Sequence, residues 1–173
     1  SLGGFGSITT AAGNTGWIKS GTYTIASATI NIATGTYSKT INSRIEGYNT
    51  TYGDRGTPPL LQAGSISTFT IITMTNVSGA VVRNIDFDGN TQTASRAVNI
   101  RGLIEKCSAI NCTGIALAIT SGSIVNCLAH DNSGTSAISG SGSIYGCVAH
   151  TNAGRGFNFS TNTSISRCIS YLN

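Results

Sequence analysis

Two carboxylates and an arginine are the residues of this sequence best suited to catalysis. Asp86 and Asp88 flank Phe87 in a segment that alternates apolar and polar residues, and Arg83 precedes them. On a strand that buries Phe87, both acids would face outward, roughly 7 Å apart. That separation suits an inverting glycoside hydrolase. The same acids would also solvate a strand and shape the corner at Gly89, and we favour this structural interpretation.

A second group of residues could bind a ligand without changing it. Tyr48 and Tyr52 lie close to Asp54 and Arg55, in or beside a polar segment, residues 49–60, that contains two consecutive prolines. Because proline cannot donate a ladder hydrogen bond, this segment is predicted to be a loop that leaves the surface. Tyrosine rings can pack on sugar rings while their hydroxyl groups form hydrogen bonds. These four residues are therefore the predicted contact surface.

Metal chemistry has less support in the sequence. His130 and His150 each follow a cysteine by three residues, and Asp131 adjoins the first. Two imidazoles could bind a metal or titrate together, but two ligands make a poor site, so we interpret both as exposed residues. No CxxC pair occurs, so zinc is not expected. We expect neither a metal nor another cofactor.

A repeated phrase of about 20 residues must position all these groups. In each copy an Ile stands three residues before a cysteine, and the cysteines follow one another at intervals of 20, 20 and 21 residues: Cys107, Cys127, Cys147 and Cys168. A unit this short cannot bury its apolar face alone, so it must stack on copies of itself. The sequence therefore predicts an all-β chain, a single-stranded right-handed parallel β-helix of about seven coils of about 20–22 residues.

The phrase also predicts what lines the inside of the coils. On a strand, Cys and the Ala two residues later point to the same face, and equivalent residues of neighbouring coils lie about 4.8 Å apart. The thiols should therefore stack inward as small apolar groups, because a disulfide between side chains that point the same way would be strained. Five residues after the Cys position, stacked side-chain amides should join coil to coil. This predicted column contains Asn90, Asn132, Asn152 and Asn173.

Three more positions follow from the same register. Gly134 and its equivalents, two residues after the Asn column, are predicted to supply a positive φ at the corner. Cys112 replaces the Asn of its coil and is predicted to be the most exposed thiol. The repeat should begin by residue 82, with Val82 equivalent to Ile104.

Composition favours one stacked domain and excludes several classes of protein. The 173 residues include 22 Gly and only 9% charged residues, and the net charge of +4 is scattered, which argues against a nucleic-acid partner. No apolar run is long enough to span a membrane, and no signal sequence is visible. Residues 1–15 lack periodicity and are predicted to be an irregular lead-in. Residues 16–173 should form the β-helix domain, which we expect to continue beyond residue 173 because no polar capping unit closes it.

Three segments resemble a known family. They read Trp17-Ile-Lys-Ser-Gly-Thr-Tyr-Thr-Ile, Ile45-Glu-Gly-Tyr-Asn-Thr-Thr-Tyr-Gly-Asp-Arg-Gly-Thr-Pro-Pro-Leu-Leu and Val82-Arg-Asn-Ile-Asp-Phe-Asp-Gly-Asn. The chain resembles the pectate-lyase-like superfamily of right-handed parallel β-helix repeat proteins and, more narrowly, uncharacterised β-helix proteins of tailed bacteriophages and prophages. The similarity covers nearly the whole chain, but its motifs specify coils and corners. The superfamily's enzymes carry calcium-binding acidic clusters with a catalytic Arg, or Gly-His-Gly with Arg-x-Lys, and this sequence has neither.

The resemblance implies a role outside the cell. We expect a non-enzymatic structural and adhesion module of a phage particle, such as a capsid decoration, fibre or tail-spike component, at the virion surface. Its expected partners are other virion proteins, a host polysaccharide, or copies of itself in a homotrimer packed through outward residues such as Val148 and Ile169. The alternatives are a polysaccharide lyase or glycoside hydrolase, and a secreted bacterial adhesin.

Overall fold

The described part of the chain consists of strands joined by turns and loops. The computed structural model describes residues 15–25, 30–31, 43–64, 70–75, 78–92, 96–160 and 162–173, so nearly all of the expected lead-in lies outside it. The strands are β1 Thr15–Lys19, β2 Thr22–Ile25, β3 Ile30–Asn31, β4 Arg44–Tyr48, β5 Leu60–Ala63, β6 Thr70–Met74, β7 Ala80–Arg83, β8 Asp86–Asp88, β9 Arg96–Glu105, β10 Ser108–Ile110, β11 Leu117–Val125, β12 Leu128–His130, β13 Ser136–Tyr145, β14 Val148–His150, β15 Arg155–Phe159, β16 Ser164–Ser166 and β17 Ile169–Tyr171.

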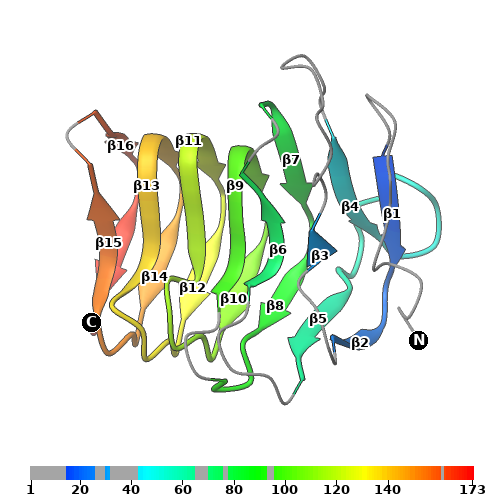
Figure 1. Cartoon of the computed structure of the whole chain (residues 1–173), viewed down its shortest axis with the longest axis horizontal. Helices are drawn as coiled ribbons and strands as arrows, with labels where there is room; N and C mark the ends of the chain where they lie inside the picture. Colours follow the sequence, from blue (N-terminus) through cyan, green and yellow to red (C-terminus); the bar gives the residue numbers. More distant parts are fainter. Residues whose placement is uncertain are drawn as a thin grey trace.

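These strands form two sheets. Sheet A has the order β1-β4-β7-β9-β11-β13-β15, with β16 beside β13 and with β6 between β3 and β9, and sheet B has the order β17-β14-β12-β10-β8-β5-β2. Every strand pair with a register is parallel. Figure 1 shows the strands side by side along the long axis of the molecule, from β1 to β15. The prediction of an all-β chain of parallel strands is confirmed, and the arrangement is consistent with a β-solenoid.

The repeated phrase sets the register of both sheets. In sheet A, Ile104 pairs with Ile124, and Ile124 pairs with Ile144. In sheet B, Ala109 pairs with Ala129 and with Phe87 of the preceding strand. Each of these side chains is buried, because alternate residues of a strand point to the same side and these point into the core. Like residues are therefore stacked on like residues through the interior.

The turns depart from the sequence-based expectation for glycine. Positive φ occurs at a column before the Asn position, at Asn111, Asp131, Thr151 and Leu172, and not at Gly134 or its equivalents. Gly134 is required for another reason, because a Cβ atom there would overlap the carbonyl oxygen of Gly114 in the neighbouring repeat. The prediction of a positive φ at these glycines was wrong. They permit close approach between backbones.

Three stacked asparagines tie the repeats together at one corner. The Asn132 amide nitrogen Nδ2 donates to Asn152 Oδ1 at 2.9 Å and to the carbonyl of Ala109 at 3.1 Å. Asn152 repeats this pattern toward Asn173 Oδ1, at 2.8 Å, and toward the carbonyl of Ala129. Each Oδ1 also accepts the backbone N–H of the preceding member. Every polar atom of the buried Asn152 amide is therefore satisfied.

Asn90 does not belong to this buried column. It is exposed, and its amide donates to the carbonyl of Ala63. Asn90 and Thr91 both have positive φ, whereas the later repeats have one such residue at this turn. The changed turn directs the side chain away from the position predicted from the sequence.

The asparagine column gives a stability prediction. Replacing Asn152 with Ala should lower the free energy of unfolding by about 2 kcal/mol or more, because buried donors and acceptors on Asn132 and Ala129 lose their partners. Ser133→Ala, at an exposed neighbouring position, is the matched control and should change it by less than about 0.5 kcal/mol. Urea unfolding followed by circular dichroism measures both, and equal midpoints would contradict a structural role for the column.

Candidate functional site

Three aromatic rings meet on the outer face of β1 and β4. Ile18 and Ile45 point inward on these strands and are buried, so Trp17 and Tyr48 lie on the opposite face. The Trp17 and Tyr48 ring centroids are 6.3 Å apart, edge to face. Tyr52, from the loop of residues 49–59 after β4, lies 5.4 Å from Trp17 and 4.7 Å from Tyr48. These three rings form the aromatic cluster of the candidate site.

The aromatic cluster is accessible to a ligand. Tyr52 is 67% exposed, and Trp17 and Tyr48 are partly exposed. Figure 1 shows the cyan loop after β4 extending to β1 at this end of the stack. Rings at such distances favour offset and edge-to-face contacts, and their exposed faces and hydroxyl groups can pack against the ring of a sugar. The arrangement provides groups that can bind a sugar.

Sequence reasoning found Tyr48 and Tyr52 but missed Trp17. The pairing of β1 with β4 places Trp17 beside Glu46, 29 residues later, whereas the clear repeat has a period of 20 or 21. If Ile18 points inward, the neighbouring Trp17 must face outward, and the sequence could have shown this. It could not show which later residue lies beside it.

Asp54 organises the 49–59 loop from within. Its carboxylate accepts backbone N–H groups of Asn49 at 2.9 Å, Thr50 at 2.7 Å, Thr51 at 2.9 Å and Gly56 at 3.2 Å. Together these hydrogen bonds hold the pKa of Asp54 well below its usual range. The carboxylate therefore stays charged and is committed to the loop backbone. It shapes the site and has little capacity left for a ligand.

Ion pairs join this loop to the sheet below it. Arg55 Nε lies 3.6 Å from Glu46 Oε1, and Arg44 and Arg83 lie 3.7 and 3.9 Å from Glu46 Oε2. Arg83 also donates a hydrogen bond from Nε to Glu105 Oε2 at 2.7 Å, and its Nη2 atom forms an ion pair with the same oxygen at 2.6 Å. Arg55 therefore forms an ion pair with a carboxylate on β4. The four residues of the predicted contact surface lie in one region: Tyr48, Tyr52, Asp54 and Arg55.

The predicted acid pair has a different environment from the one expected. Asp88 is only 9% exposed, and its oxygens accept hydrogen bonds from Gln62 at 2.8 Å, the Asn90 backbone at 2.7 Å and Asn111 at 3.0 Å. Asp88 alternates with the inward Phe87, as the sequence predicts, but the following turn and two side-chain amides cover it. The interactions of Asp88 support the structural interpretation of this residue.

Asp86 and Arg83 do not complete a catalytic group with Asp88. Burial raises the pKa of Asp86, while hydrogen bonds with Ser108 oppose the shift. Arg83 lies on β7 in sheet A and pairs with Glu46 and Glu105, whereas both aspartates lie on β8 in sheet B. The corner between β7 and β8 therefore places Arg83 and the two aspartates on different sheets, and Arg83 forms ion pairs with glutamates of sheet A.

The two histidines stack with Tyr171 on the outside of sheet B. The ring centroids of His130 and His150 are 4.9 Å apart, and those of His150 and Tyr171 are 5.0 Å apart. His130 Nδ1 lies 2.7 Å from Asp131, and His150 Nδ1 lies 2.9 Å from the Thr151 hydroxyl. Among the residues that the structure describes, no three or more His, Cys, Asp or Glu side chains are grouped so as to hold a metal ion.

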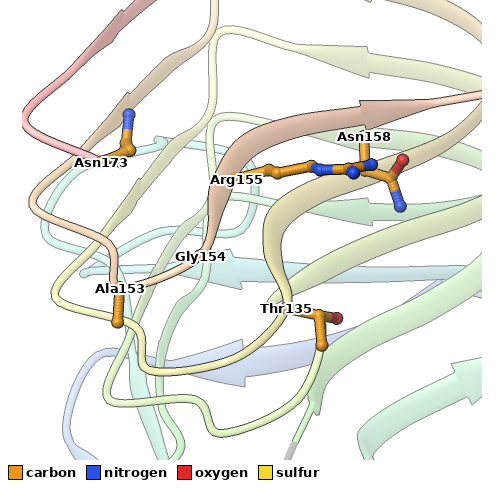
Figure 2. A pocket seen from close by; sticks show the side chains of 6 residues that line it. All are labelled: Thr135, Ala153, Gly154, Arg155, Asn158 and Asn173. Atoms are coloured by element: carbon orange, nitrogen blue, oxygen red, sulfur yellow. The ribbon is translucent and has the colours of Figure 1, made fainter.

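A shallow hollow of about 590 Å³ lies near β15, lined by Thr135, Ala153, Gly154, Arg155, Asn158 and Asn173. Figure 2 shows the Arg155 side chain extending toward Asn158 and the backbone turns around Gly154 below it. The lining contains one cation and two amides but no carboxylate. It offers hydrogen-bond donors without an acid or base, and the sequence pattern gave no sign of it.

All five cysteines are free thiols. Cys107, Cys127 and Cys147 are buried, and Cys168 is partly buried. In each case Sγ lies 3.5 to 3.8 Å from a carbonyl oxygen of the preceding repeat, so the four thiols repeat the same environment. Cys112 is also buried, with no exposed surface, so the prediction that it is the most exposed thiol was wrong. It takes the inward corner position of Asn132, whose Oδ1 accepts the Cys112 backbone N–H.

Comparison with known proteins gives no family assignment. No protein-family model matches the chain, and no curated protein sequence matches it. In the described ranges, no helix has the length and apolar character needed to cross a membrane.

Burial of Cys112 leads to a pH-dependent prediction. Removal from water, with the charge of Asp88 nearby, raises the pKa of the Cys112 thiol to about 12. At pH 9 an unperturbed thiol is largely ionised, but Cys112 should be almost entirely protonated, so alkylation by iodoacetamide should be at least about 100-fold slower than in urea. Because burial raises the pKa of Cys112 in the folded chain, the neutral thiol contributes to the free energy of unfolding. This contribution is complete below about pH 9 and is lost as the pH rises further. Peptide mass spectrometry locates the label, and rapid labelling of Cys112 in the folded protein would contradict its burial.

Proposed function

We propose that the chain is a right-handed parallel β-helix of about seven coils that serves as a non-enzymatic structural and adhesion module of a phage particle. The parallel sheets and the stacked 20-residue phrase support the coil architecture. The resemblance to phage β-helix proteins supports the virion setting. In this proposal the stacked strands form a rigid support, and the 49–59 loop meets a host polysaccharide or another virion protein.

The observation that carries the adhesion proposal is the aromatic cluster of Trp17, Tyr48 and Tyr52. Its rings lie within 4.7 to 6.3 Å of one another, and the shape of the loop that supplies Tyr52 is fixed by the four backbone hydrogen bonds of Asp54. A preformed site loses less conformational entropy on binding than a mobile one. Aromatic surface that remains accessible on a fixed loop supports recognition of a glycan.

The contacts of the acidic residues favour binding over cleavage. Glycoside hydrolysis needs one carboxyl group to donate a proton and a second to act as base or nucleophile. Asp88 already accepts three hydrogen bonds from the protein. Its role is therefore better explained as support for the corner after β8.

Truncation of Tyr52 tests the proposed binding surface. If the cluster packs on a sugar, Tyr52→Ala should weaken binding about tenfold, since aromatic contacts contribute on the order of 1 kcal/mol beyond area burial. Tyr171→Ala, which removes another exposed tyrosine on sheet B, is the control and should bind as the wild type does. A glycan array identifies the ligand and titration calorimetry measures the affinities. No binding by the wild-type chain, or equal loss in both variants, would contradict the proposal.

The virion setting has its own test. Particles of a phage that encodes the chain should contain it after density-gradient purification, in an amount comparable to other structural proteins. Quantitative mass spectrometry of the particles gives that ratio. Presence only in the lysate supernatant would refute virion incorporation while leaving glycan binding to be judged by the array.

A further inference from the structure

The 49–59 loop is ordered internally but needs an attachment to the sheet. The Asp54 carboxylate bonds to four of its backbone N–H groups, which fixes the shape of the loop but not its position over β1. Tyr52 is mostly exposed, so its contacts with Trp17 and Tyr48 bury little area. Such limited burial contributes little to stability. A further interaction with the sheet therefore helps to hold the loop where the three rings meet.

Arg55 supplies that attachment. In the described part of the chain it is the loop residue that forms an ion pair with a strand, at 3.6 Å from Glu46 on β4. Arg55 has a φ of 50°, a conformation that few non-glycine residues adopt. This unusual backbone geometry adjoins Asp54, and the ion pair places the Arg55 guanidinium beside the carboxylate on β4.

Glu46 is a suitable partner for the Arg55 guanidinium. Its side chain is only 3% exposed although it lies on the outer face of β4, next to Trp17 of β1. A carboxylate with so little access to water is costly unless cations compensate it. Three arginines lie within 4.0 Å, namely Arg44 at 3.7 Å, Arg55 at 3.6 Å and Arg83 at 3.9 Å. Two of these belong to strands, so Glu46 retains partners when Arg55 is absent.

We propose that Arg55 and the buried carboxylate of Glu46 form an electrostatic clasp that positions the 49–59 loop and assembles the aromatic cluster. Arg55 is then a positioning residue, and it acts on a ligand through Tyr52. Arg44 and Arg83 keep Glu46 compensated, so opening the clasp releases the loop without destabilising the sheet. The inference concerns the assembly of the site, and only its consequence for adhesion rests on the proposed function.

Trp17 is the only tryptophan in the chain, so its fluorescence reports on the loop directly. Arg55→Gln removes the positive charge. Glutamine has a Cβ atom as arginine does, so the positive φ at this position constrains the backbone of both proteins alike. We expect this variant to shift Trp17 emission to longer wavelength and to increase its quenching by acrylamide, with an unchanged urea midpoint. Arg44→Gln removes another partner of Glu46 that does not belong to the loop, and should leave both fluorescence readings as in the wild type.

A salt titration of the wild-type chain provides a second measurement without a substitution. The Debye length falls from about 10 Å at 0.1 M salt to about 3 Å at 1 M, so a clasp closed by a partly exposed arginine should loosen and reproduce the Arg55→Gln shift. If Arg55→Gln and high salt both leave Trp17 unchanged, or if Arg44→Gln has the same effect as Arg55→Gln, the clasp is refuted.

Glycan binding separates this inference from the proposed function. With a glycan ligand found on the array, the wild type and Arg44→Gln should bind alike, and Arg55→Gln should bind about tenfold more weakly, as Tyr52→Ala does. A clasp confirmed by fluorescence in a chain that binds no glycan would refute adhesion alone. Glycan binding and Trp17 fluorescence that both remain unchanged in Arg55→Gln would refute the clasp alone.

Discussion

The structure depends on one geometric constraint, the parallel pairing of each repeat with the next at a single strand spacing. At about 4.8 Å, a side chain stands directly beside its counterpart in the neighbouring repeat, so whatever occupies a position must tolerate a copy of itself. Ile, Ala and Cys satisfy this condition by packing like on like. Asn satisfies it because an amide is both donor and acceptor, and therefore Asn132 can bond to Asn152. Glycine satisfies it at Gly134 by leaving room for the next backbone.

The same constraint explains how far sequence reasoning could reach. Where the period is 20 or 21, one pair of equivalent residues fixes all the others. The matching apolar positions around Val82 extended this register across an interval of 22 residues, so the pairing of Val82 with Ile104 could also be predicted. Small changes in a turn defeat such counting, as at Asn90, where a second residue with positive φ moves the side chain out of the buried column. Burial by neighbouring side chains is also invisible in a periodic pattern, as at Asp88. Cys112 is buried for another reason, because it takes the inward corner position of the Asn column.

The candidate site shows a further limit of sequence patterns. Tyr52, Asp54 and Arg55 are close in sequence, so their shared loop could be recognised. Trp17 and Glu46 come from different strands whose separation of 29 residues does not follow the repeat, and the site could not be completed without their pairing. Regular repeats therefore supply the support, while an irregular insertion between β4 and β5 supplies the distinctive chemistry. This division agrees with the general tendency of binding residues to lie on loops held by a rigid framework.

Pairing of neighbouring repeats can be observed directly in solution. Scalar couplings across hydrogen bonds, measured by nuclear magnetic resonance, connect an amide nitrogen to the carbonyl carbon that accepts from it. In the structure, the Leu128 N–H donates to the Cys107 carbonyl at 3.0 Å. The Val148 N–H donates to the Cys127 carbonyl at 2.9 Å, and the Ile169 N–H donates to the Cys147 carbonyl at 3.0 Å. We expect a cross-hydrogen-bond correlation for each of these three pairs in the folded chain. Correlations from these amides to other carbonyls would contradict the stacking on which the fold and the candidate site rest.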